Sequence, residues 1–252
     1  MVNALRDSSI MCKRNLLLLT RMPESLITAT LIPFFLMLLF GGVFGGIADV
    51  GAISYVSFVL PGIMLQAIAQ SNASTAISVS IDVNRGIVDR FRSMDIAKSS
   101  VLVGHAFTST LKHMLSAAVM IGTAFILDFE PTASLGAWLA VVGLVLLIAT
   151  AFTWLGILCG LVSKTPEAAS GYMFPLFILP FVSSGFAPIE TMPRWLGIFA
   201  QYQPMTPIID SLRGLMLGLP MGNALPIAIA WCVGITAITF ILSVRLYNRK
   251  SA

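Results

Sequence analysis

The chain has 252 residues and a formal net charge of +4 at pH 7, but only 10% of its residues are charged, against about 25% in ordinary soluble domains. Its 57% hydrophobic content and its mean hydropathy of +0.92 exclude a soluble enzyme and a nucleic-acid-binding domain, and they predict an all-α integral membrane protein. At roughly 20 residues per spanning helix, the length accommodates six transmembrane helices in a single transmembrane domain, residues 1–252, without room for a soluble catalytic domain.

Residues 1–23 contain basic side chains ahead of the first apolar run. On a helical projection Arg6, Lys13 and Arg14 fall on one side, whereas Leu16 and other apolar residues fall on another. This pattern predicts an amphipathic N-terminal helix that lies in the membrane interface. A basic anchor that only fixes topology is the alternative interpretation.

The first two predicted spans cover residues 26–46 and 55–80. The second carries a dense polar face, and its amides and hydroxyls should face protein or water rather than lipid. Gln66, Gln70 and Asn72 on this face are candidates to line a substrate path, and interhelical packing explains them equally well.

The polar run 82–98, DVNRGIVDRFRSMDIAK, interrupts the apolar sequence with both signs of charge. Its apolar residues recur at roughly helical spacing, which predicts a short amphipathic helix that meets a partner outside the bilayer. The charges can form salt bridges with a soluble partner, while Phe91 and Met94 can fill a groove on it. A loop that only enforces topology would require the basic residues but not these apolar anchors. The candidate docking residues are Arg85, Asp89, Arg90, Phe91, Arg92 and Met94.

A third span is predicted from residue 101 to 127, and Lys112 and His113 interrupt it. Met114 to Phe129 already provides about 16 residues, or roughly 24 Å at 1.5 Å per residue. We therefore expect Lys112 near the polar boundary, with its ammonium group reaching toward water. A proton relay or a substrate contact through this Lys-His pair is the alternative.

The fourth span, 135–162, carries Gly156 and Gly160 in a GxxxG spacing, which fits packing within the chain as well as dimerisation. The fifth span, 168–187, contains two prolines that break regular backbone hydrogen bonding. Kinked membrane helices of this kind usually border protein or a cavity. The candidate substrate path therefore also includes Phe174, Phe177 and Phe181.

Residues 188–218 have the pattern of two short helices. Thr191 and Thr206 are the predicted N-caps, and Gly218 is the predicted stop. Both helices are too short to span the bilayer but apolar enough to dip into its outer edge, as a re-entrant pair. A final span is predicted over residues 224–244.

Within this outer region, Trp195 belongs to the first short helix. Asp210 and Arg213, in the second, are spaced i, i+3 and can pair on one helix face. These three residues are the candidate functional side chains of the re-entrant pair.

The distribution of basic residues predicts the topology. With a cytoplasmic N-terminus, twelve of the 15 Lys and Arg residues lie inside, against Arg194 and Arg213 outside. Six spans with both termini cytoplasmic fit this distribution, in a multi-pass protein of the cell membrane. The run 82–98 then lies in the cytoplasm and the segment 188–218 on the outer side.

Catalytic motifs are missing from the sequence. The patterns GxxxxGK[ST], HExxH and GxSxG do not occur, so we expect the chain neither to bind ATP nor to act as an enzyme. Cys12, Cys159 and Cys232 show no ligand spacing, so neither a metal site nor a disulfide is predicted.

Two segments carry a family resemblance. They are RGIVDRFRSMDIAKSSVLVGHAF, residues 85–107, and FVSSGFAPIETMPRWLGIFAQYQPMTPIIDSLRGLMLG, residues 181–218. Both resemble the permease subunits of type-2 ATP-binding-cassette exporters, particularly the daunorubicin-resistance branch, and the resemblance extends over nearly the whole chain. Asp95 departs from the family pattern, in which a proline follows RFRS and one apolar residue, and this leaves the end of the docking helix open.

The resemblance implies an export function for the chain. Two such permeases, identical or paralogous, pair in the membrane lipid, and each docks a separate ATPase subunit that binds ATP and Mg. Hydrophobic or amphipathic molecules, such as lipids or drugs, are exported. The run 82–98 then corresponds to the coupling helix, and residues 188–218 to the re-entrant outer helices. A polysaccharide or glycolipid exporter of the same superfamily is one alternative, and a proton-coupled secondary carrier is a more distant one.

Overall fold

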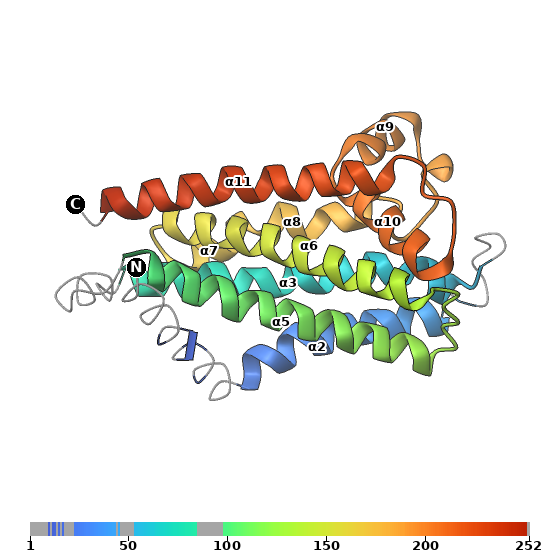
Figure 1. Cartoon of the computed structure of the whole chain (residues 1–252), viewed down its shortest axis with the longest axis horizontal. Helices are drawn as coiled ribbons and strands as arrows, with labels where there is room; N and C mark the ends of the chain where they lie inside the picture. Colours follow the sequence, from blue (N-terminus) through green and yellow to red (C-terminus); the bar gives the residue numbers. More distant parts are fainter. Residues whose placement is uncertain are drawn as a thin grey trace.

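The computed structural model describes residues 23–43, 53–84 and 98–250, together with single residues at 10, 12, 13, 15, 17 and 45. All regular structure within these residues is helical, as predicted (Figure 1). The elements are α2 (Pro23–Leu38), the π-helical η1 (Leu39–Val43), α3 (Tyr55–Asn84), α5 (Lys98–Ile126), α6 (Leu135–Val162), α7 (Pro166–Tyr172), α8 (Phe174–Ile178), the 3₁₀ segments η2 (Leu179–Val182) and η3 (Ile189–Thr191), α9 (Arg194–Tyr202), α10 (Met205–Leu217) and α11 (Ala224–Lys250).

Among the described residues, three helices are long and apolar enough to cross a membrane, over Val101–Ile126, Leu135–Val162 and Ala224–Arg249. The apolar stretch Thr30–Val43 is shorter. Helix α3 has 30 residues, or about 45 Å at 1.5 Å per residue, and its amide and hydroxyl side chains dilute its apolar character. A multi-pass membrane protein follows from these helices.

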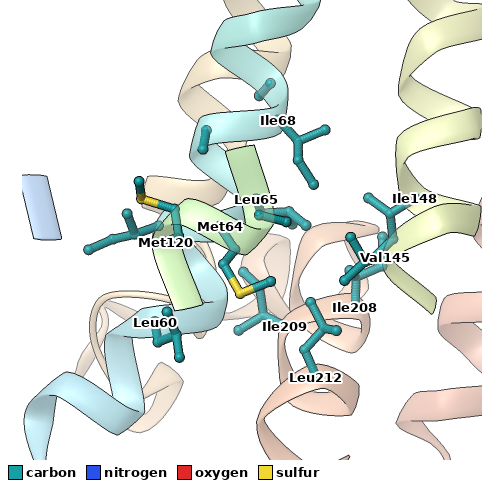
Figure 2. Close-up of a cluster of buried hydrophobic side chains, with 14 of the residues drawn as sticks. Leu60, Met64, Leu65, Ile68, Met120, Val145, Ile148, Ile208, Ile209 and Leu212 are labelled. Atoms are coloured by element: carbon teal, nitrogen blue, oxygen red, sulfur yellow. The ribbon is translucent and has the colours of Figure 1, made fainter. Parts of the chain in front are cut away.

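Helix α3 lies at the centre of the bundle and is buried along most of its length. It packs against α2, α5, α6, α7 and α10, and Figure 1 shows it behind α5 and α6. Figure 2 shows how side chains from four helices meet in the core. The cluster includes Met64, Leu65 and Ile68 of α3, Met120 of α5, Val145 and Ile148 of α6, and Ile208, Ile209 and Leu212 of α10.

Two glycines of α6 explain how closely this helix approaches α3. A Cβ atom on Gly160 would lie 2.5 Å from the carbonyl oxygen of Ala76, and one on Gly156 would collide with the Asn72 side chain. The GxxxG spacing therefore serves packing within the chain, which decides between the two interpretations that the sequence left open.

The fifth predicted span is broken into three short pieces, α7, α8 and η2. Pro166 occupies the first turn of α7, where Thr165 is the N-cap and its Oγ1 accepts a hydrogen bond from the backbone N–H of Ala168. Pro175 and Pro180 lie in the first turns of α8 and η2, so each proline coincides with a new start of the helix, as its missing N–H predicts.

The short outer helices α9 and α10 occur where they were predicted, but their N-caps differ. Pro193 and Pro204 occupy the cap positions, whereas Thr191 ends the 3₁₀ turn η3. Thr206 lies inside α10 and donates through its hydroxyl to the carbonyl of Ala200 instead. The predicted stop at Gly218 is confirmed, because this residue adopts φ of +65° in the left-handed region.

The two ends of the bundle differ in what they carry. Figure 1 shows the end of α3, the start of α5 and the C-terminal end of α11 together at one end of the long axis. Helices α9 and α10 lie at the opposite end. The predicted interfacial helix of residues 1–23, apart from a few single residues, and the predicted docking residues from Arg85 to Met94 lie outside the described part of the chain.

Candidate functional site

The helices that flank the predicted docking segment are joined by a buried polar pair. Asp82 lies in the last turn of α3 and His105 in the second turn of α5. Their Oδ2 and Nε2 atoms are 3.0 Å apart, and both side chains are largely buried. The end of α3 and the start of α5 are therefore linked directly to each other by this contact.

The three polar candidates of the substrate path differ in exposure. Gln66 and Asn72 are fully buried, whereas Gln70 is half-buried on the outer side of α3. Asn72 donates through Nδ2 to the carbonyl of Phe152, at 2.6 Å, and contacts the sulfur of Met173, at 3.5 Å. These contacts give Asn72 a place in the packing of α3 against α6 and the broken span, so Gln70 is the one of the three that a ligand can reach.

The three phenylalanines of the candidate path form one row of contacting rings along the broken span. The ring centroids of Phe174 and Phe177 are 6.3 Å apart, and those of Phe177 and Phe181 are 6.0 Å apart. The row continues from Phe181 to Phe186, at 4.7 Å, and from Phe186 to Phe40 of η1, at 5.0 Å. Phe174, at the free end of the row, is 61% exposed.

Phe40 and Phe186 are members of this row that sequence reasoning missed. Phe186 follows the last predicted aromatic residue closely, but it lies beyond the helical pieces, where helical spacing has no meaning. Phe40 belongs to a segment more than a hundred residues earlier, so only the tertiary arrangement brings it to the row.

Lys112 does not reach toward a polar boundary as predicted. It is only 6% exposed, and its Nζ donates to the Ser74 hydroxyl of α3. The prediction was wrong because α5 runs from Lys98 to Ile126, which places Lys112 at its midpoint. The neighbouring His113 is fully buried and contacts Thr153 of α6 through Nδ1, at 3.2 Å.

Arg213 forms a dense polar network at the other end of the bundle. Its Nη1 donates to Asp210 at 2.8 Å, which confirms the predicted i, i+3 pair. Nε and Nη2 donate to the carbonyl of Phe58 at 3.2 and 2.9 Å, and Nη2 also donates to the carbonyl of Ser184 at 2.6 Å. The guanidinium carbon lies 4.0 Å from the centroid of the Phe58 ring.

This network fixes α10 to the core of the bundle. Ser184 donates through its hydroxyl to Asp210 at 2.6 Å, so α3, the turn after η2, and α10 are linked through two polar side chains. Burial lowers the pKa of the Arg213 guanidinium and Asp210 opposes that change, but arginine ionises so far above neutral pH that it stays charged.

Helix α9 presents an apolar surface at the same end. Trp195 is 73% exposed and Tyr202 is 75% exposed. Together with Ile198 and Phe199, they follow the i, i+3, i+4, i+7 spacing of one helix face. Trp and Tyr are the residues enriched at membrane interfaces, so this face fits the edge of a bilayer.

Within the described residues, no group of three or more His, Cys, Asp or Glu side chains could hold a metal ion. Cys12, Cys159 and Cys232 are free thiols. The described part of the chain instead offers a row of aromatic rings along the broken span and a polar network that anchors α10.

Comparison with known proteins places this arrangement in a family. Residues 7–217 match the ABC-2 type transporter family. The chain is 30% identical over 234 residues to a daunorubicin resistance ABC transporter permease protein of Streptomyces coeruleorubidus, covering 91% of this chain and 82% of that protein. It is 24% identical over 242 residues to a probable doxorubicin resistance ABC transporter permease protein of Mycobacterium tuberculosis, covering 93% and 86%. It is also 26% identical over 219 residues to a putative transport permease of Cyanophora paradoxa, covering 84% and 74%. The chain belongs to the ABC-2 type transporter family.

Proposed function

We propose that this chain is the membrane-spanning permease subunit of an ATP-driven exporter of hydrophobic or amphipathic molecules. The observation that carries the proposal is the match to a drug-resistance permease over 91% of the chain, at 30% identity. ATP and Mg bind to a separate ATPase subunit, and this chain supplies no catalytic residue. It crosses the cell membrane six times with both termini in the cytoplasm, and it pairs with a second copy or a paralogue.

The coupling step is assigned to residues 82–98. Arg85, Asp89, Arg90 and Arg92 form salt bridges with the ATPase, while Phe91 and Met94 enter a groove on its surface. Motion of this segment is transmitted to the spans as a rigid-body movement. The contact between Asp82 and His105 supports this assignment, because it joins the two helices that flank the segment.

The substrate path is assigned to the aromatic row of Phe174, Phe177 and Phe181 and to the half-buried Gln70 of α3. The exposed end of the row supports this assignment, since flat aromatic side chains stack favourably against apolar and aromatic ligands. Broken backbone at membrane depth is tolerated where it borders protein or a water-filled cavity, which is the environment of a transport path.

Docking is tested by co-purification of the chain with its ATPase subunit from detergent. Phe91→Asp and Arg90→Glu are expected to abolish co-purification, because the first places a charge in the apolar contact and the second reverses a salt bridge. Lys164→Glu is the matched control, because it changes charge in an exposed loop outside the segment. Intact assembly in both docking variants would overturn the docking assignment.

Transport is tested in inverted membrane vesicles that contain the chain and its ATPase. Uptake of daunorubicin is expected to require ATP and to persist when the proton gradient is collapsed. Uptake driven by a proton gradient in the absence of ATP would instead support a secondary carrier.

A further inference from the structure

Two stripes of polar side chains run side by side where α3 meets α5. On α3, Gln70, Ser74 and Ser78 follow one another at intervals of four residues, so they share a helix face. Gln70 and Ser74 are half-buried and Ser78 is exposed. This face therefore contacts α5 at Ser74 and is open at the surface of the chain at Ser78.

The opposing stripe on α5 has the same spacing. Thr108, Lys112 and Ser116 also follow one another at intervals of four residues. The contact of Lys112 with Ser74, and that of Ser109 with Thr75 at 2.9 Å, fix the antiparallel register of the two helices.

This register pairs residues one turn to either side of the Lys112–Ser74 contact. On one side Thr108 is paired with Ser78, and on the other Ser116 is paired with Gln70. The hydroxyl oxygens of Thr108 and Ser116 are buried and have no hydrogen-bond partner. Buried hydroxyls are normally satisfied, so these two groups, one helical turn to either side of Lys112 in the sequence, are donors without an acceptor.

The charge of Lys112 has no counter-ion in the described part of the chain. The ion pairs found there join His105 to Asp82 and Arg213 to Asp210, and Lys112 takes part in neither. Its partner Ser74 donates its own hydroxyl to the carbonyl of Ser71, at 2.7 Å. One hydroxyl oxygen accepts one of the three ammonium protons, and because it is neutral it does not balance the positive charge.

The position of Lys112 along α5 places this site far from both ends of the helix. Fourteen residues of α5 lie on each side of it, or about 21 Å in either direction at 1.5 Å per residue. A group that binds here is therefore at membrane depth. An ionisable residue at that depth typically marks a substrate or ion pathway.

We propose that Lys112, held in place by Ser74, and the hydroxyls of Thr108 and Ser116 bind the acidic group of an anionic amphipathic molecule during its passage through the membrane. The acidic group is a carboxylate, sulfonate or phosphate, which accepts the ammonium and hydroxyl protons together. The apolar part of the molecule leaves the site through the opening beside Gln70 and Ser78. This inference rests on the proposed export function, and it adds acidic amphiphiles to the substrates of that function.

The test measures binding to the purified full chain in nanodiscs of phosphatidylcholine. The probes are 11-(dansylamino)undecanoic acid and its uncharged methyl ester, which share the same apolar part, and binding is followed by energy transfer from tryptophan. The wild type is expected to bind the acid more tightly than the ester. Lys112→Gln is expected to raise the Kd for the acid by about tenfold or more, with little change for the ester, whereas Lys112→Arg retains the preference.

Two controls make the test decisive. Lys164→Gln removes a positive charge from an exposed loop and is expected to leave both affinities unchanged. Equal affinities of the wild type for acid and ester would overturn the proposal, even if Lys112→Gln fails to fold. Equal weakening of both probes in Lys112→Gln would also overturn it, because a structural role predicts that result.

The source of the acidic group is resolved by adding phosphatidylglycerol to the nanodiscs. Competition with the acid probe identifies a lipid phosphate as an occupant, and absence of competition identifies a free amphiphile; both results support an anion site. Failure of the export function is distinguishable, because wild-type vesicles would then show no ATP-driven uptake while the acid still binds.

Discussion

Two buried basic side chains, Arg213 and Lys112, have opposite surroundings. Arg213 donates to a carboxylate and to two backbone carbonyls and lies over an aromatic ring, whereas Lys112 donates to a single hydroxyl. Removing a buried charge that has both a counter-ion and several hydrogen bonds is strongly destabilising, so Arg213 helps to hold the structure together. A buried residue whose charge is left without a counter-ion is costly to keep, and such residues are typically functional. A buried basic residue thus has a structural role in α10, and the surroundings of Lys112 in α5 support the binding role that we propose for it.

The largest effect is expected from removing the structural cation. Arg213→Met leaves Asp210 with only its hydrogen bond from Ser184 and removes the bonds that Arg213 donates to two backbone carbonyls, so stability should fall by about 3 kcal/mol. The measurement is thermal unfolding of the detergent-solubilised chain by tryptophan fluorescence. Arg194→Met, at an exposed position in the first turn of α9, is the matched control and should leave the midpoint unchanged. An unchanged midpoint in Arg213→Met would show that the network does not hold α10 to the core of the bundle.

A smaller effect is expected from neutralising the carboxylate. Asp210→Asn keeps an oxygen that accepts from Arg213 and Ser184 but removes the negative charge, and the Asp210 side chain is partly exposed. We expect a loss of about 1 kcal/mol and a lower midpoint in the same unfolding experiment. If Asp210→Asn lowered the stability as much as Arg213→Met does, the charge of Asp210 would contribute more to stability than the hydrogen bonds from Arg213 to the carbonyls.

The smallest change in stability is expected at Lys112. Lys112→Met replaces a buried ammonium by an apolar side chain of similar length, and exchanges of this kind are often neutral or stabilising. The unfolding midpoint should therefore move by no more than the equivalent of about 1 kcal/mol. A large destabilisation would contradict the comparison, because it would give Lys112 the structural role of Arg213.

Much of the fold follows from local patterns in the sequence. Helix α6 begins and ends at the predicted residues, α3 begins at the predicted Tyr55, and the outer helix pair stops at Gly218. These features depend on the length of apolar runs and on proline and glycine, which act within one turn of the chain. The pair of Asp210 and Arg213 was predictable for the same reason, since both residues lie on one helix.

The features that escaped prediction depend on contacts between distant segments. The burial of Lys112 follows from the packing of α3 against α5, and counting residues along one span cannot show which neighbour a side chain meets. Phe40 joins the aromatic row across more than a hundred residues. Thr206 matched an N-cap pattern, but its hydroxyl donates to the carbonyl of Ala200 instead.

The contrast between α6 and α11 has a consequence for how this chain tolerates change. In the apolar 18-residue stretch of each helix, 61% is buried within the chain for α6, against 22% for α11. Side chains of α6 must fit the space left by the neighbouring helices. Most side chains of α11 need only remain apolar, because lipid accepts any apolar side chain. Mutational drift is therefore expected to be freest in α11, and the family match, which covers residues 7–217, ends before that helix begins.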